Sequence, residues 1–385
     1  MKKALSIMFA LLLLFLLPAC GGEEDDYDDT PSGGDGGNND GNGGWESQEG
    51  QDWKILKFED DLSKAYLQQI ILGLNDEIYL AGYTYDNLYA ELNGKNDPFL
   101  LAINSKGKKL WGKQWGVPVI HSSNNDVSGM SVDTDGNIYV TIYGNPSVAK
   151  FSPEGTKIWE IFPDLENGNI STLKLDKFNN VYLGISRGKE TDPILIKYSN
   201  QGKELQRYNI SNSSRETNVV DVAVDSEGNI YAGGFTYDNL FADNAGKVDA
   251  FLAKIAPDGT QLWGKQWGSE GEDKIWSIVF DNNQNIFVTF GMNVTSKDVN
   301  YMARLFSSDG NILWEINNRC GSPVVCGNNI YCFSVRQIDK YDSEGKYLGS
   351  SIKYEDKIER ITCDNNNIYA ITSKDIIKLP LSAIK

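Results

Sequence analysis

A short apolar pair that follows a polar turn recurs along the chain and limits the possible folds more than any other feature. The pair joins an aliphatic to an aromatic residue and stands at 78–79, 138–139, 181–182, 230–231, 286–287, 330–331 and 368–369. Several of the preceding turns, such as 133–137 and 225–229, are built from Asp, Asn and Gly, which tolerate the left-handed backbone of tight hairpins. A repeat of roughly 40 to 60 residues made of short strands is typical of a β-propeller.

Each repeat can be divided into four strands. An apolar stretch such as 219–225 comes first, and a third strand such as 249–255 leads into a second hairpin that carries a glycine. These glycines are Gly107, Gly155, Gly202, Gly259, Gly310 and Gly345. Four of them are followed four residues later by a tryptophan, namely Trp111, Trp159, Trp263 and Trp314. We predict that the glycine supplies a positive φ and that the indole ring is a wedge between neighbouring blades.

We therefore expect an all-β fold, a seven-bladed β-propeller of four-stranded antiparallel blades, over residues 53–385. The expected blades span about 60–116, 117–163, 164–210, 211–268, 269–318, 319–352 and 353–385. The last repeat ends after three strands, and segment 53–58 resembles an unpaired fourth strand. Because a closed ring leaves no free sheet edge, we expect this N-terminal strand to complete the seventh blade.

The first residues predict export and lipidation. Two lysines precede an apolar run that is too short to span a membrane comfortably, which indicates a signal peptide over 1–19. The run ends in Leu17-Pro18-Ala19-Cys20, which resembles a bacterial lipobox with Cys20 as the lipidated residue. The alternative is an ordinary secretory signal with an incidental cysteine. The lipid would be the only membrane contact, at the outer membrane of the cell envelope.

Residues 20–52 are expected to be a disordered tether. They contain 11 Asp or Glu, 10 Gly and no Lys or Arg, so they cannot bury enough apolar surface to fold. The acidic cluster after Cys20 also resembles the surface-export signal of some Bacteroidota lipoproteins. A charge run can equally be a solvated segment, so a surface-exposed and a periplasm-facing protein both remain open. The acidic net charge of −17 argues against a nucleic-acid partner, and a monomer is expected.

A long internal repeat, here called the echo, contains two extended loops. Segments 82–116 and 234–268 share 21 of 35 residues without a gap, and each contains an extended connection, at 84–97 and 236–249. These connections carry oxygen ligands of the type that calcium prefers. They are Asp86, Asn87, Glu91 and Asp97 in the first loop and Asp238, Asn239, Asp243 and Asp249 in the second. No cofactor is assigned, and calcium is kept as a hypothesis; the favoured interpretation is a loop whose Asp and Asn side chains close turns.

The remaining cysteines and the single histidine limit the chemistry. Cys320, Cys326, Cys332 and Cys363 all lie near the C-terminus, and an exported protein can form disulfides from them. Two disulfides, or one disulfide with two buried thiols, are both possible, and the sequence does not separate the three pairings. His121 is the only histidine, and no Gly-x-Ser-x-Gly motif accompanies it, so no catalytic residue is assigned.

The repeats resemble a known family. Segments 228–236, 249–268 and 268–281 look like units of the bacterial seven-bladed β-propeller repeat (SBBP) family. The resemblance implies an exported protein, often a lipoprotein, and it brings no common catalytic motif. The expected role is a binding or interaction scaffold for protein or glycan. The alternatives are a periplasmic scaffold of the outer-membrane-assembly type and a polysaccharide hydrolase or lyase.

Overall fold

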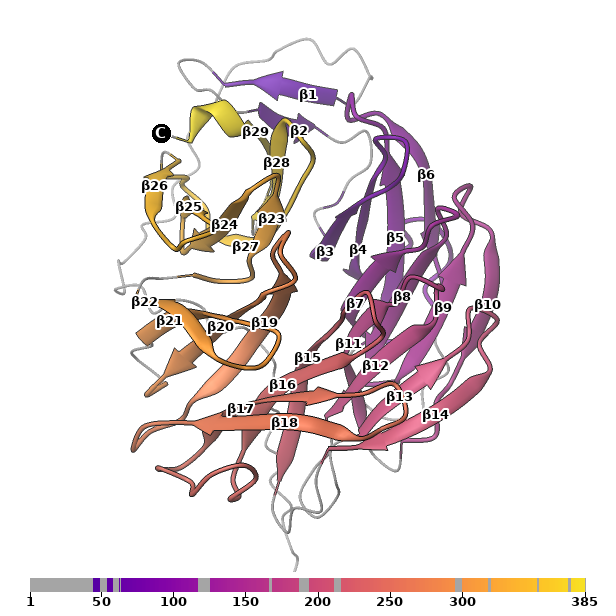
Figure 1. Cartoon of the computed structure of the whole chain (residues 1–385). Coiled ribbons are helices and arrows are strands. Elements are labelled where there is room, and N and C mark those ends of the chain that lie inside the picture. The colour runs from indigo at the N-terminus through magenta and orange to yellow at the C-terminus, as the bar shows by residue number, and fades with distance from the viewer. Residues whose placement is uncertain are drawn as a thin grey trace, which may run out of the picture.

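The computed structural model describes the chain in blocks separated by gaps. The described residues are 44–48, 54–57, 62, 64–116, 125–165, 168–186, 194–210, 216–294, 300–317, 320–351, 353–372 and 375–384. They form strands throughout, with one short 3-10 helix, η1 (Leu381–Ala383) (Figure 1). The signal peptide, Cys20 and His121 lie outside the described residues. Within the described part of the chain, no helix is long and apolar enough to cross a membrane.

Four sheets contain four antiparallel strands each, in simple meander order. The first holds β3 (Ala65–Leu72), β4 (Ile78–Thr84), β5 (Asp97–Ile103) and β6 (Lys109–Gln114). The second holds β7 (Asp126–Val132), β8 (Ile138–Tyr143), β9 (Ser147–Phe151) and β10 (Lys157–Ile161). The third holds β19 (Lys274–Phe280), β20 (Ile286–Met292), β21 (Asn300–Phe306) and β22 (Ile312–Ile316). The fourth holds β23 (Val324–Cys326), β24 (Asn329–Ser334), β25 (Gln337–Asp342) and β26 (Tyr347–Ser350).

One larger sheet has eight strands and joins two of the sequence repeats. Its first half is β11 (Asn169–Leu175), β12 (Val181–Ser186), β13 (Ile194–Tyr198) and β14 (Glu204–Asn209). Its second half is β15 (Thr217–Val224), β16 (Ile230–Thr236), β17 (Asp249–Ile255) and β18 (Gln261–Trp267). The halves meet where Ser186 of β12 pairs with Asn218 of β15. The prediction of seven separate blades is therefore wrong: the described strands form five sheets of four or five strands and one eight-stranded sheet.

The five-stranded sheet contains both ends of the described chain. Its order is β1 (Gly44–Ser47), β2 (Lys54–Lys57), β29 (Ile376–Pro380), β28 (Asn367–Thr372) and β27 (Ile358–Cys363). In Figure 1 the indigo β2 lies beside the yellow β29, and their register pairs Lys54 with Lys378 and Ile55 with Ile377. The N-terminal strand thus joins the last sheet, as expected.

Strand β1 was not expected. It lies inside the segment predicted to be a disordered tether, yet all four of its residues pair with β2. The Trp45 indole N–H donates to the Ser105 carbonyl at 3.0 Å, and the ring lies 5.9 Å from that of Tyr369. One aromatic side chain with two packing partners is enough to order four residues of an otherwise polar segment. The predicted tether, 20–52, therefore extends too far toward the C-terminus.

The first strands of the repeats lie next to one another around the centre of the molecule. Contacts run in the order β3, β7, β11, β15, β19, β23, β27 and back to β3. In this order β15 lies between β11 and β19, and its buried Asp221 carboxylate accepts hydrogen bonds from both of these strands. The donors are the Thr172 hydroxyl at 2.8 Å, the Ser277 hydroxyl at 3.3 Å and the Ile278 N–H at 2.8 Å. A buried carboxylate with this many donors fixes the spacing of three adjacent strands.

The recurring glycine and tryptophan meet across sheets, which confirms the predicted wedge. Trp111 of β6 donates its indole N–H to the Pro153 carbonyl, 2.8 Å away, in the next sheet's second hairpin. The hairpin glycine, Gly155, has φ 79°. The same contact links Trp159 to Asn200, Trp263 to Ser308 and Trp314 to Ser343. Strand β14 has no such tryptophan, and there the Tyr208 hydroxyl makes the corresponding contact by donating to the Pro257 carbonyl at 3.2 Å.

Two disulfides stabilise the C-terminal sheets. Cys320 pairs with Cys332, and Cys326 pairs with Cys363. The first bond is local. The second connects β23 to β27 and so links two different sheets. Because a cross-link that closes a longer loop restricts the unfolded chain more, the second bond is expected to contribute more to stability.

Candidate functional site

The two faces of the molecule differ in how their polar groups are used. Because neighbouring strands are antiparallel, the first hairpin, between the first and second strands of a repeat, and the second hairpin, between its third and fourth strands, lie on one face, here called the turn face. The connections between second and third strands lie on the opposite face, here called the loop face. The loop face therefore carries both long connections, 84–97 and 236–249.

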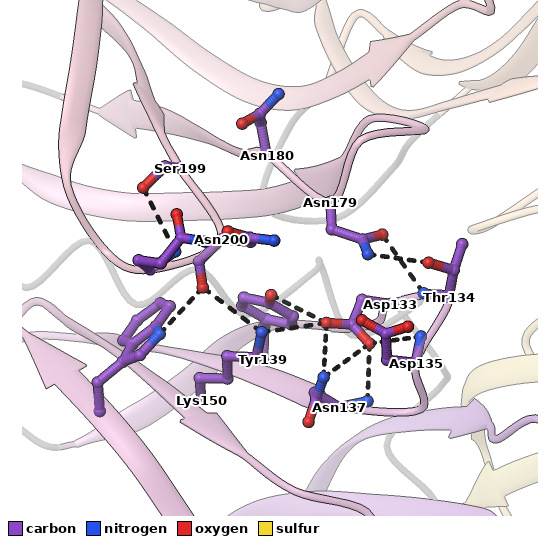
Figure 2. A network of polar contacts seen from close by, with 12 residues as sticks. Asp133, Thr134, Asp135, Asn137, Tyr139, Lys150, Asn179, Asn180, Ser199 and Asn200 are labelled. Carbon is purple, nitrogen blue, oxygen red and sulfur yellow. Dashed lines mark hydrogen bonds and ion pairs between the residues drawn. The ribbon is translucent and has the colours of Figure 1, made fainter.

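On the turn face, an aspartate organises several of the first hairpins, at positions 133, 176, 225, 281 and 364. Asp133 accepts hydrogen bonds from the Asn137 N–H at 2.8 Å and the Tyr139 hydroxyl at 3.0 Å, and it pairs with the Lys150 ammonium at 3.2 Å (Figure 2). Burial opposes the charge of Asp133, but these donors outweigh it and hold the pKa of the carboxyl below its usual value. The same aspartate, asparagine and tyrosine arrangement recurs around Asp176 and Asp225.

These networks also connect adjacent repeats. Asn179, at the tip of the next first hairpin, donates its side-chain amide to the Thr134 hydroxyl at 2.8 Å (Figure 2). The Lys150 ammonium and the Trp159 indole N–H both donate to the Asn200 carbonyl, at 3.4 and 3.1 Å. The polar groups of these turns are thus engaged in hydrogen bonds within and between repeats.

A glutamine that the sequence did not single out holds the first long loop. The side-chain oxygen of Gln114, on β6, accepts hydrogen bonds from three successive backbone N–H groups, those of Leu88, Tyr89 and Ala90, at 2.8, 3.0 and 3.4 Å. Its amide nitrogen donates to the Asp86 carbonyl at 3.1 Å and to the Asp97 carboxylate at 3.3 Å. One side chain therefore fixes the whole turn of the loop.

The second long loop is held in the same way. Gln266 of β18 accepts from the N–H groups of Leu240, Phe241 and Ala242, at 2.8, 3.0 and 3.4 Å. In both loops an aromatic ring lies over a glycine of the outer strand, because an added Cβ would come within 2.4 Å of Tyr89 at Gly112 and within 2.3 Å of Phe241 at Gly264. The repeated Trp-Gly-Lys-Gln motif thus serves the loop as well as the hairpin.

The predicted calcium ligands mostly bond to their own loops. Asp97 is buried and accepts from the Asn93 N–H at 2.9 Å, and Asp249 accepts from the Ala245 N–H at 3.0 Å. Asn87 and Asn239 accept from backbone N–H groups five residues on, each at 2.9 Å. The Asp238 carboxylate accepts from the Asn239 N–H, and Asn239 donates to Asp243 at 3.4 Å. Asp86 pairs with Lys64 at 2.8 Å, and Glu91 is exposed.

The structure does not bring the two sets of ligands together, because the loops belong to different sheets. Among the described residues, no group of three or more His, Cys, Asp or Glu is arranged to hold a metal ion. Calcium binding stays a prediction, and the loop-closing hydrogen bonds give its residues a structural role.

Three tyrosines gather where the first long loop leaves its sheet, and we call them the tyrosine triad. Tyr66 and Tyr83 are cross-strand partners on β3 and β4, and their rings stack with centroids 5.0 Å apart. Tyr85 meets both rings edge-on, at 5.8 and 5.5 Å. Tyr66 is 52 % exposed and Tyr85 is 38 % exposed. Exposed aromatic rings that are already packed against one another are typical of a binding surface.

Polar groups border the triad. Gln68 of β3 donates to the Asp126 carboxylate at 3.3 Å and accepts from the Val127 N–H at 2.6 Å. Burial raises the pKa of the Asp126 carboxyl, against the opposing effect of Gln68. Burial, with a contribution from the negative charge of Asp126, also raises the pKa of Tyr83. Gln68 stands two residues after Tyr66 on β3, and its hydrogen bond to Asp126 holds that carboxylate beside the strand that carries Tyr66.

The second copy of the echo lacks this triad. The positions 152 residues further on are Asn218, Phe235 and Tyr237. There the Lys274 ammonium lies over the Phe235 ring, 4.9 Å from its centroid, and pairs with Glu272 at 2.8 Å. The two copies share the residues that hold the loop and differ in those that stand beside it.

The sequence reasoning missed the triad for an identifiable reason. Tyr83 lies near the end of β4 and Tyr85 follows that end, and their spacing of two residues in the sequence was an available signal. Tyr66 joins them only through the register of β3 and β4, which is offset by an extra residue between Leu67 and Gln69.

Comparison with known proteins gives the fold. No family model and no curated protein sequence matches this chain. A catalytically inactive virginiamycin B lyase from Staphylococcus aureus, crystallised with quinupristin, has a TM-score of 0.60 at 11 % identity, over 86 % of this chain and 99 % of that one. The fold is a β-propeller.

Two further solved structures have a similar likeness. A streptogramin B lyase has a TM-score of 0.58 at 12 % identity, over 83 % of this chain and 94 % of that one. A chain of the mitotic checkpoint complex also has a TM-score of 0.58 at 12 % identity, over 84 % of this chain and 91 % of that one. At such low identities the likeness establishes the propeller fold of this chain and says nothing of its ligands.

Proposed function

We propose that this β-propeller is a lipid-anchored scaffold of the cell envelope that binds a protein or glycan ligand through its loop face. The observation that carries the proposal is the contrast between the faces. On the turn face the carboxylates hold their own hairpins and the Asn179 amide and the indoles bond to neighbouring repeats, whereas the loop face presents the exposed tyrosine triad beside a long loop. Loops positioned by a rigid scaffold are common binding elements.

The location of the protein in the cell envelope forms the second part of the proposal. The lipobox-like Leu17-Pro18-Ala19-Cys20 and the acidic segment behind it support an outer-membrane lipoprotein of the SBBP type. Metabolic labelling with a palmitate analogue should mark the wild-type chain and fail to mark Cys20→Ala. Protease treatment of intact cells then separates the two orientations: a surface protein is removed, and a periplasm-facing scaffold is protected. An unlabelled wild-type chain would refute the lipid anchor.

The binding role can be tested by masking each face in turn. The side chains of Glu91 on the loop face and Phe178 on the turn face are both exposed. A cysteine introduced at either position, Glu91→Cys or Phe178→Cys, can be coupled to a polyethylene glycol chain. Residues 44–385 would be applied to an outer-membrane fraction and to immobilised polysaccharides. We expect retention to be lost only when the loop face is masked. Absence of retention by the unmasked domain, or equal retention of both conjugates, would contradict the proposal.

A further inference from the structure

We infer that the tyrosine triad, together with Asp126 and Gln68, is a subsite for a neutral saccharide. The inference rests on the proposed binding role of the loop face and names the chemical class of its ligand.

The rings have the exposure and arrangement that sugar binding requires. One face of a pyranose ring presents C–H groups, whose partial positive charge suits the negative face of an aromatic ring. Tyr66 is 52 % exposed, so its ring is accessible, while Tyr83 stacks behind it at 5.0 Å and Tyr85 stands edge-on at 5.8 Å. The arrangement forms a platform with a side wall.

The platform is held in place by the sheet. Tyr66 and Tyr83 are paired residues of two hydrogen-bonded strands. Gly82 allows their close approach, because a Cβ at that position would lie 1.8 Å from the Tyr66 carbonyl oxygen. Rings fixed by the backbone lose little conformational freedom when a ligand binds, which favours recognition of a weakly binding sugar.

The neighbouring polar groups fit sugar hydroxyls. The Asp126 carboxylate and the Gln68 side chain share one hydrogen bond at 3.3 Å, and among the described residues Gln68 is the hydrogen-bond partner of that carboxylate. A carboxylate and an amide can accept from and donate to the hydroxyl groups at the edge of a sugar ring. Asp126 also makes this region unfavourable for acidic sugars, since like charges repel, whereas the charge of Asp86 is balanced by Lys64 at 2.8 Å. A neutral saccharide is therefore the expected ligand.

The second copy of the echo is an internal comparison. Asn218 replaces the stacking ring, and the chain's own Lys274 covers Phe235 at 4.9 Å. The second copy therefore has no ring at the position of the exposed Tyr66, and the ring at the position of Tyr83 is covered by a cation instead of a tyrosine. The loop-holding residues Gln114 and Gln266 are the same in both copies, so holding the loop does not account for the triad.

The test uses residues 44–385 and isothermal titration with cellohexaose, xylohexaose, mannohexaose and maltohexaose, with hexagalacturonate as the acidic counterpart. We expect at least one neutral oligosaccharide to bind. Tyr66→Ala should weaken that binding about tenfold, whereas Tyr66→Phe should retain it, because the contact is made by the ring face. Tyr237→Ala, at the position of the second copy that corresponds to Tyr85, should leave the binding unchanged. Tyr85→Ala provides a second loss variant should Tyr66→Ala fold poorly.

Each outcome bears on the inference. Binding of none of the neutral sugars, binding of hexagalacturonate alone, or equal affinity of Tyr66→Ala and wild type would overturn it. If the sugars fail while masking of Glu91 still abolishes retention on envelope material, the loop face binds something else and the proposed function stands. If masking Glu91 has no effect, the proposed function itself is refuted.

Discussion

The indole ring of Trp111 lies directly on the backbone of Gly155 in the neighbouring sheet. Its N–H donates to the Pro153 carbonyl at 2.8 Å, and a Cβ on Gly155 would lie 2.7 Å from the ring. The glycine therefore has two reasons to lack a side chain: a φ of 79° and the ring above it. The same kind of indole contact joins other neighbouring repeats, so a substitution at one glycine tests an interaction that the propeller uses several times.

Gly155→Ala should destabilise the domain by about 3 kcal/mol, because it adds left-handed strain and displaces an indole ring. Gly327→Ala is the matched control: Gly327 has φ 58° and nothing within 4 Å of the added Cβ. Strain alone should cost about 1 kcal/mol there. Equal losses in chemical denaturation would show that the ring contact contributes nothing.

Shortening the N-terminus should identify where the fold begins. A chain starting at residue 44 should melt like the longer protein, whereas one starting at residue 53 loses β1 and the Trp45 contacts with Ser105 and Tyr369. We expect its melting temperature to fall by about 6 °C. Trp45→Ala in the longer chain should reproduce most of this fall. A chain from residue 53 that melts unchanged would mean that β1 is not part of the stable fold.

Gln114→Ala should loosen the first long loop and leave the second intact. The substitution removes the acceptor of three backbone N–H groups, so hydrogen exchange over residues 86–93 should accelerate at least about tenfold. Gln266→Ala should do the same only to the second loop, which makes each variant the control for the other. Unchanged exchange in both would show that the aromatic rings alone hold the loops.

Calcium should have little effect on stability. The Asp97 and Asp249 carboxylates already accept backbone N–H groups of their own loops, at 2.9 and 3.0 Å, and calcium binding would have to replace these bonds. We expect the melting temperature to be the same in millimolar calcium and in chelator. A rise that Asp97→Asn abolishes would instead support the calcium site predicted from the sequence.

Two aspartates should respond to pH in opposite directions. The lowered pKa of Asp133 means that its charge stabilises the fold above the unfolded pKa of about 3.9 and that this contribution is lost as the pH falls through the folded pKa. Asp133→Asn should therefore cost about 2 kcal/mol near neutral pH, with the loss shrinking in acid.

Asp126 has a raised pKa, so its ionised form opposes folding at pH values above that pKa. Asp126→Asn should stabilise the domain near neutral pH, with the gain vanishing below about pH 3.9. Urea denaturation of the two variants and wild type across this range measures both effects. The same sign for both substitutions would contradict the assignments.

Local patterns in the sequence predicted local structure well. The spacing from Gly155 to Trp159 placed the hairpin glycine and the wedge correctly, because both depend on a short stretch of chain. The number of separate sheets did not follow, since Ser186 and Asn218 pair across a connection whose path no local pattern specifies. Strand β1 was missed because the acidic, glycine-rich composition around Trp45 concealed a single strong packing residue.

The candidate site was harder to predict because it depends on register. The sequence drew attention to the long loops, but the carboxylates in them mostly bond to the loop backbone. Tyr66 stands 17 positions before Tyr83, and only the pairing of β3 with β4 stacks the two rings. Gln114 was likewise hidden, because its repeated motif was interpreted only as part of a hairpin.

The position of β1 determines how a mechanical load would enter the domain. A pull on the chain before Gly44 acts first on β1, which pairs only with β2, while β2 is bound on its other side to β29. Peeling β1 away frees the 4 residues of this strand, or roughly 14 Å of extended chain. The strand would thus detach before the pairing between β2 and β29 breaks, and a brief pull would lengthen the chain while β2 stays in its sheet.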